Sequence, residues 1–279
     1  MRAAAHAAVA ARVVAPFEMG REAVTAFTKD AEVMDEALFA NILSMEMEVP
    51  TDTADQVKNT YLIIMSALYE IDGWVDRYST KAAETVLKLF KEARAGLAKQ
   101  GGKVPLTDKG GTKSLARMLH FLVDVSVPFH SAKVLTFEDV GRYTMIPGEK
   151  ERNEYVRGLI ENLVIFIAAH DAYEQIGEER WEAMVKGIGA SSGDIDLGGV
   201  DDAELSLYLK NWVDGQVDLV KGKYQDASIM MQEWQENQGD AKAVDEIEGR
   251  AVKLQAQCLG PAVDVSTKLL SGFYPRKKG

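Results

Sequence analysis

The stretch His120-Phe-Leu-Val-Asp124-Val-Ser-Val-Pro128-Phe-His130 decides how this chain folds around its few histidines. The chain has four histidines in 279 residues, and two of them lie in this segment. His120 and Asp124 are four residues apart, so on a helix they share one face. Pro128 breaks the helix and can direct His130 back toward the same place. Two imidazoles and a carboxylate brought together in this way suit a zinc-like ion.

This segment resembles the central motif of the S1/P1 nuclease family, zinc phosphodiesterases and 3′-nucleotidases related in fold to bacterial zinc phospholipase C. The family's string His-Phe-x-x-Asp-x-x-x-Pro-x-His is reproduced from His120 to His130 without a gap. The N-terminus is also similar, because the family's mature chain has His at its sixth residue, followed by Ala-x-Val-Ala, and His6 is followed here by Ala-Ala-Val-Ala. His120 and His130 could instead be core histidines satisfied by hydrogen bonds, but with Asp124 at the family spacing we favour ancestral ligands.

Two further similarities follow in the order that the family has them. The segment from Gly73 to Tyr78, Gly-Trp-Val-Asp-Arg-Tyr, is similar to the family's Trp-Ala-Asp ligand segment. The segment His170-Asp-Ala-Tyr-Glu174 is similar to the family's His-x-x-Trp-Asp, with Tyr in place of Trp and Glu in place of Asp. The resemblance therefore runs from Met1 to Glu174.

Ligand roles carried over residue by residue imply a partial zinc centre. By resemblance, the ligands would form three sets: the amine and carbonyl of Met1 with His6 and Asp124; Asp76 with His120 and Asp124; and His130 with His170 and Glu174. The family chelates three zinc ions with five histidines, and this chain has four, so we expect fewer than three ions. In an active enzyme Asp76 would be the residue closest to a role as ligand and catalytic base.

Several of these residues also have an interpretation that involves no metal. His6 could be a packed or surface residue of an alanine-rich helix, and Asp76 could be a solvated carboxylate at a helix end. His170 and Glu174 could form an exposed pair on a helix. The sequence leaves these alternatives open.

Composition limits the setting in which the protein works. The net charge of −11 and the lack of a Lys/Arg stripe argue against a general nucleic-acid-binding surface, although not against a small phosphate substrate. No uncharged apolar run reaches the roughly 18 residues of a membrane span, so we expect no transmembrane segment. Cys258 is the single cysteine and no Asn-x-Ser/Thr site occurs, unlike the usual secreted family members, so we expect a protein that is not secreted. The first 17 residues contain Arg2 and Arg12 but no acid, as in mitochondrial targeting peptides, and we therefore expect a mitochondrial protein.

Apolar residues recur mainly three and four positions apart, and strand-like alternation is scarce, which predicts an all-α fold. Helices are expected over residues 3–15, 19–46, 53–76, 80–99, 112–127, 151–176, 178–187, 201–236 and 240–270. Breaks or kinks are expected at Pro50, Pro105, Pro128, Pro147 and Pro261. We expect one multi-helical, S1/P1 nuclease- and phospholipase C-like domain, in which residues 1–200 form the core and residues 201–279 form two long helices that pack on the core or on a partner.

The incomplete ligand set leads to two hypotheses about function. We expect a catalytically degenerate relative that serves as an accessory subunit of a larger assembly, such as a mitochondrial respiratory complex, with other protein subunits as partners. A remaining zinc ion would then stabilise the fold without catalysis. The alternative is an active zinc-dependent phosphodiesterase or 3′-nucleotidase that acts on single-stranded nucleic acid or nucleotides.

Overall fold

The computed structural model covers the central motif and the C-terminal half of the chain. The residues that it describes are 3–19, 24–25, 27–28, 78–130, 142, 145–189, 197 and 199–277. The helices expected over residues 19–46 and 53–76, and Pro50, fall largely or wholly outside these residues.

Most of the described residues lie in helices. Their bounds are α1 (Ala3–Val14), α5 (Tyr78–Lys99), α6 (Lys109–Asp124), α8 (Glu149–Glu179), α9 (Trp181–Gly187), α10 (Asp202–Glu236) and α11 (Ala241–Leu270). The described part contains one isolated β-bridge and no β-strand. The predicted all-α class is therefore confirmed.

Aspartate side chains begin α6, α10 and α11. Asp108 precedes α6 and accepts a hydrogen bond from the amide of Gly111 at 2.8 Å. Asp201 and Asp240 cap α10 and α11 in the same way, each accepting from two backbone amides of the first turn. A carboxylate at this position satisfies amides that have no partner within the helix, which is why the helices begin at these residues.

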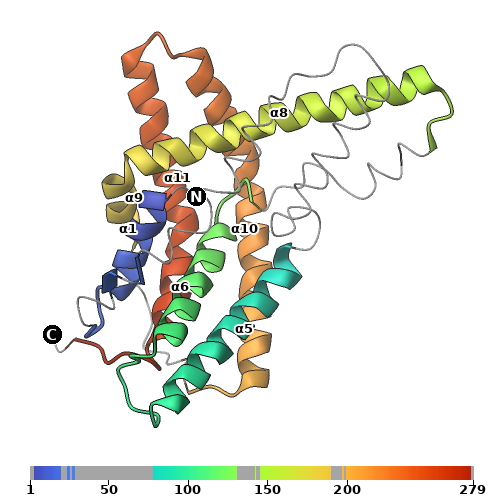
Figure 1. Cartoon of the computed structure of the whole chain (residues 1–279). Coiled ribbons are helices and arrows are strands. Elements are labelled where there is room, and N and C mark those ends of the chain that lie inside the picture. Colours follow the sequence, from blue (N-terminus) through green and yellow to red (C-terminus); the bar gives the residue numbers. More distant parts are fainter. Residues whose placement is uncertain are drawn as a thin grey trace.

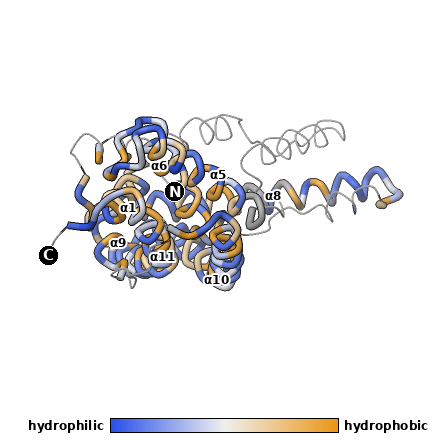
Figure 2. The backbone as a smooth tube through the Cα atoms, turned by 90° about the horizontal axis from the view of Figure 1, so that it is seen from below, coloured by the Kyte–Doolittle hydropathy of each residue, from blue (hydrophilic) through white to orange (hydrophobic). Residues whose placement is uncertain are grey.

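The helices α5, α6, α10 and α11 lie side by side, and α1 lies next to α6 and α11 (Figure 1). The long helix α8 crosses α10 and α11 partway along their length, and its N-terminal half extends beyond the group (Figures 1 and 2). This arrangement brings α1, the end of α6 and the C-terminal half of α8 together, although they are far apart in the sequence.

A large cluster of buried apolar side chains joins the two halves of the chain. It includes Val9 of α1, Leu119 of α6, Ile176 of α8, Leu209 of α10 and Leu259 of α11. Removing such side chains from water is the main favourable contribution to folding. The helical pair of residues 201–279 therefore packs on the described part of the preceding chain.

Proline has different effects at two of the predicted break points. Pro128 lies in the turn that follows α6, as expected. The helix expected over residues 240–270 is present, because α11 continues through Pro261 to Leu270. Pro261 lacks an amide hydrogen and so removes one hydrogen bond from the helix, but the buried residues on both sides of it keep the helix in the core.

The segment after α1 pairs with the segment after α11. Phe17 and Arg276 form the isolated antiparallel bridge, in which the Glu18 amide donates to the Pro275 carbonyl at 2.8 Å. The Lys277 amide donates to the Pro16 carbonyl, also at 2.8 Å. These bonds hold the C-terminal segment against the end of α1.

Within the part of the chain that the structure describes, no helix combines the length and the apolar character needed to cross a membrane.

Candidate metal centre

The first candidate ligand, His6, lies in the first turns of α1. This helix is rich in alanine, so its backbone can approach neighbouring helices closely. The His6 side chain is buried, with 1% of its surface exposed. The interpretation of His6 as a surface residue is therefore wrong, and the side chain faces the interior.

The central motif has the predicted local geometry. His120 and Asp124 lie one turn apart on α6, and α6 ends at Asp124. The amide of Val127 then donates to the Asp124 carbonyl at 3.0 Å, and the amide of His130 donates to the Val127 carbonyl at 3.0 Å. This tight turn returns His130 to the end of α6, where its Nδ1 lies 3.6 Å from Asp124 Oδ1.

His170 and Glu174 lie one turn apart on α8. Both side chains are buried, with 0% and 5% of their surfaces exposed. The interpretation as an exposed helical pair is therefore wrong. Tyr173, which directly precedes Glu174, is also buried and packs against Phe129, with the ring centroids 5.2 Å apart.

The first group of donors consists of His6, His120 and Asp124. His6 Nε2 lies 3.2 Å from Asp124 Oδ1, and His120 Nε2 lies 3.1 Å from Asp124 Oδ2. The two imidazoles are stacked, with centroids 4.5 Å apart and planes 16° apart. Because ligand lone pairs lie in the ring plane, nearly parallel stacked rings do not direct them at one point. Each histidine instead faces its own oxygen of the shared carboxylate.

The second group consists of His130, His170 and Glu174. The Nε2 atoms of His130 and His170 are 2.9 Å apart, and they lie 3.2 Å and 2.9 Å from Glu174 Oε1. The ring planes are 71° apart, so the in-plane lone pairs of both histidines can meet at one point. Hydrogen bonds alone do not explain this triangle well, since two ring nitrogens and one oxygen all converge on the same small space.

The distances in the second group agree with those around a zinc ion. Zinc binds histidine nitrogen and carboxylate oxygen at roughly 2.0–2.2 Å with tetrahedral angles, so neighbouring ligand atoms lie about 3.3 Å apart. The three distances in this group are 2.9, 2.9 and 3.2 Å. His130, His170 and Glu174 could therefore hold one metal ion with three protein ligands, at distances compatible with zinc.

The electrostatics of the site favour ligand-competent forms of its side chains. Burial opposes ionisation of Asp124, but neighbouring positive charge, with the largest part from His120, outweighs it and holds the pKa of Asp124 well below its usual range. Burial also opposes ionisation of Glu174, yet neighbouring positive charge, with His170 contributing part of it, and hydrogen bonds with His130 and His170 hold the pKa of Glu174 well below its usual range. Burial lowers the pKa of His130, despite the opposing effect of Asp124, and keeps its ring neutral. Ionised carboxylates and neutral imidazoles are the forms that bind metal ions.

Six of the eight residues that the sequence suggested as ligands are thus brought together, in two groups linked by the contact between His130 and Asp124. The other two, Met1 and Asp76, lie outside the described residues. The role suggested for Asp76 as a catalytic base stays a prediction.

Sequence reasoning missed two side chains that support the site. Glu178 of α8 accepts hydrogen bonds from the amides of Ala4 and Ala5, the residues just before His6. The buried Gln216 of α10 donates to Ser126 Oγ, in the turn between Asp124 and His130. Neither Glu178 nor Gln216 belongs to a recognisable sequence motif. Their positions depend on how α8 and α10 pack, which the local sequence does not reveal.

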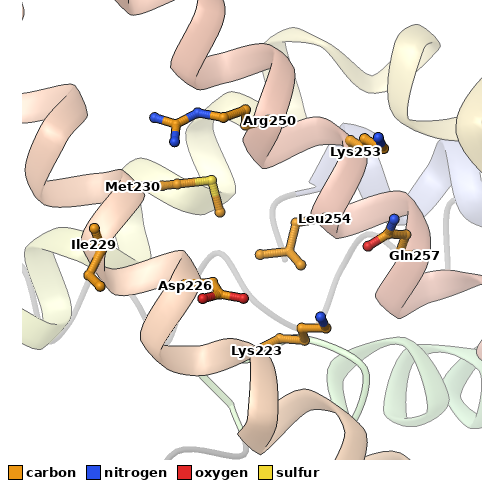
Figure 3. Close-up of a pocket in the computed structure, with 8 residues that line it drawn as sticks. All are labelled: Lys223, Asp226, Ile229, Met230, Arg250, Lys253, Leu254 and Gln257. Carbon is orange, nitrogen blue, oxygen red and sulfur yellow. The ribbon is translucent and has the colours of Figure 1, made fainter.

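A cleft of about 370 Å³ lies between α10 and α11 (Figure 3). Its lining combines apolar and charged side chains: Lys223, Asp226, Ile229, Met230, Arg250, Lys253, Leu254 and Gln257. None of the six candidate ligands is among them, so this cleft is a feature distinct from the candidate metal centre.

No protein-family model, curated protein or solved structure matches this chain significantly. The candidate metal centre is therefore interpreted from its own geometry.

Proposed function

We propose that the protein is a zinc-binding accessory subunit of a larger assembly, derived from an S1/P1 nuclease-like ancestor. The observation that carries the zinc site is the triangle of His130 Nε2, His170 Nε2 and Glu174 Oε1, with sides of 2.9–3.2 Å in a buried place. The sequence resemblance, which assigns the same three residues to one zinc ion, supports the proposal.

The proposed role of the ion is structural. The donors of the second group come from the turn after α6 and from α8, so a bound zinc ion would cross-link two segments that are 40 residues apart or more. All six candidate ligands have at most 6% of their surfaces exposed. A buried ion that joins two segments stabilises the folded state, because the unfolded chain does not hold the ligands together.

The shortage of histidines supports a non-catalytic role. The chain has four, whereas the resemblance implies five for a complete centre. Loss of a ligand weakens metal binding and alters the geometry that catalysis needs. We propose mitochondria as the location, on the basis of Arg2, Arg12 and the acid-free N-terminal segment; recovery of the protein outside mitochondria on cell fractionation would refute this.

The test of zinc binding uses the full chain, its zinc content measured by mass spectrometry after dialysis. We expect bound zinc in the unchanged protein, and loss of the ion at the second group in His170→Ala. Glu161→Ala, an exposed acid on the same helix, is the matched control and should keep the wild-type zinc content. Zinc at a free concentration of 100 times Kd should raise the free energy of unfolding by about 2.7 kcal/mol. Absence of zinc from the unchanged protein would refute the proposal.

The accessory role has its own test. In native extracts the protein should migrate with a mass well above that of the single chain, together with other polypeptides. Migration as a free monomer would contradict the proposed role, whatever the zinc content.

A second candidate function is a zinc-dependent phosphodiesterase or 3′-nucleotidase. It is favoured by the number of donors in the second group, because three protein ligands leave a coordination position open, as in catalytic zinc sites. A zinc ion there would supply a Lewis acid for a phosphate ester. Hydrolysis of single-stranded nucleic acid or nucleotides by the zinc-loaded protein, abolished in His120→Ala, would establish this function. Zero turnover with full zinc content would exclude it.

A further inference from the structure

The start of α1 is held by a residue from another helix. The first amides of a helix have no partner within it, and α1 has no acidic residue in its own first turn. Glu178 of α8 takes this place, since its Oε2 accepts from the amide of Ala4 at 3.0 Å and from the amide of Ala5 at 3.3 Å. A carboxylate is also favourable near the positive end of the helix dipole. The start of α1 is therefore capped by a side chain distant in sequence.

Glu178 continues a row of side chains on one face of α8. His170, Glu174 and Glu178 are spaced four residues apart, so they lie on the same side of the helix, one turn after another. The first two are donors of the second group, and the third holds α1. His6 follows Ala5 directly, so α8 bears two of the three donors of one group and the anchor of a donor in the other.

We propose that Glu178 is a positioning residue for His6, which fixes the start of α1 on α8 and so sets where the imidazole meets Asp124. The inference rests on the proposed zinc-binding function. Helix geometry gives the size of the displacement that Glu178 would prevent: a slip of one residue moves a helix by about 1.5 Å and turns it by roughly 100°. The contact between His6 Nε2 and Asp124 Oδ1 is 3.2 Å long, so such a slip would break it.

The test measures zinc affinity in the full chain by competition with a chelator, for Glu178→Ala, Glu178→Gln and the control Glu179→Ala. Glu179 is the exposed neighbour of Glu178. We expect Glu178→Ala to weaken zinc binding by His6 and Asp124 Oδ1, the oxygen that His6 faces, by roughly 10- to 100-fold, as is usual for a side chain that orients a ligand. The second group should keep its affinity. Glu178→Gln keeps an acceptor oxygen and should restore most of the loss, and Glu179→Ala should behave as the unchanged protein.

A double variant separates positioning from a general effect on folding. A residue that acts through His6 has nothing left to position in His6→Ala, so adding Glu178→Ala to that variant should change zinc affinity by less than about twofold. An equal loss with and without His6 would overturn the inference, and so would wild-type affinity in Glu178→Ala. Absence of zinc from the unchanged protein is a different result, since it overturns the zinc-binding function itself and this inference with it.

Discussion

Replacing Gln216 by leucine tests whether the turn that carries His130 is held in place from α10. Gln216 has 4% of its surface exposed, and its Nε2 donates to Ser126 Oγ at 3.0 Å and to the Cys258 carbonyl at 2.8 Å. Leucine is similar in size and keeps the apolar contacts of α10, but it donates no hydrogen bond. The substitution therefore removes two buried hydrogen bonds that join α10 to the turn and to α11.

The expected cost follows from these bonds. A neutral hydrogen bond contributes about 0.5–1.5 kcal/mol net, so two give about 1–3 kcal/mol. Ser126 Oγ still donates to the Leu122 carbonyl at 3.0 Å, and Cys258 lies within α11, so neither partner is left without any bond. We therefore expect the lower half of the range, about 1–2 kcal/mol less free energy of unfolding.

The assay is urea denaturation followed by far-ultraviolet circular dichroism. Gln232→Leu is the control, because Gln232 is exposed on the same helix and bonds only Glu236 within a turn, a pair worth about 0.2–0.5 kcal/mol. Ser126→Ala should cost less in the Gln216→Leu background than alone, because the two share a bond. A loss for Gln216→Leu no larger than that of the control would refute the reasoning.

Three other predictions concern the candidate metal centre. Phe129→Ala should lower the free energy of unfolding by about 3–5 kcal/mol in a thermal or urea assay, since it removes a buried ring beside His130; a loss below that of a typical surface substitution would contradict this. Glu178→Ala should lower the free energy of unfolding of the zinc-free protein by about 1 kcal/mol in the same assay, the usual effect of losing a helix cap, and an unchanged midpoint would count against the cap. The zinc-free protein should lose stability on acidification in two steps. Below about pH 6.5 the free energy of unfolding should fall because the pKa of His130 is lowered in the folded protein, so the unfolded chain takes up this proton first. Below about pH 4 it should fall further because the lowered pKa values of Asp124 and Glu174 favour the folded protein only while these carboxylates are ionised. Urea titrations from pH 7 to pH 3 should follow this order, and greater stability at pH 4 than at pH 7 would disprove it.

Local features of the site could be predicted from the sequence. The spacing of His120 and Asp124 places them on one helix face, and Pro128 marks the turn that returns His130. The relative placement of these three residues could therefore be predicted from one continuous segment. The starts of α10 and α11 could also be predicted, because aspartate caps act within a few residues.

The rest depends on contacts between distant helices. The burial of His170 and Glu174 is set by where α8 crosses the other helices, and the sequence of α8 alone is equally compatible with an exposed pair. Glu178 and Gln216 support the site only because of this packing.

The bridge between Phe17 and Arg276 makes the site sensitive to events far along the chain. Trimming of the last few residues by a protease would remove the backbone partners of Pro16 and Glu18 and free the end of the helix that presents His6. Loss of these residues would then misalign the imidazole of His6, which lies more than 260 positions earlier in the chain.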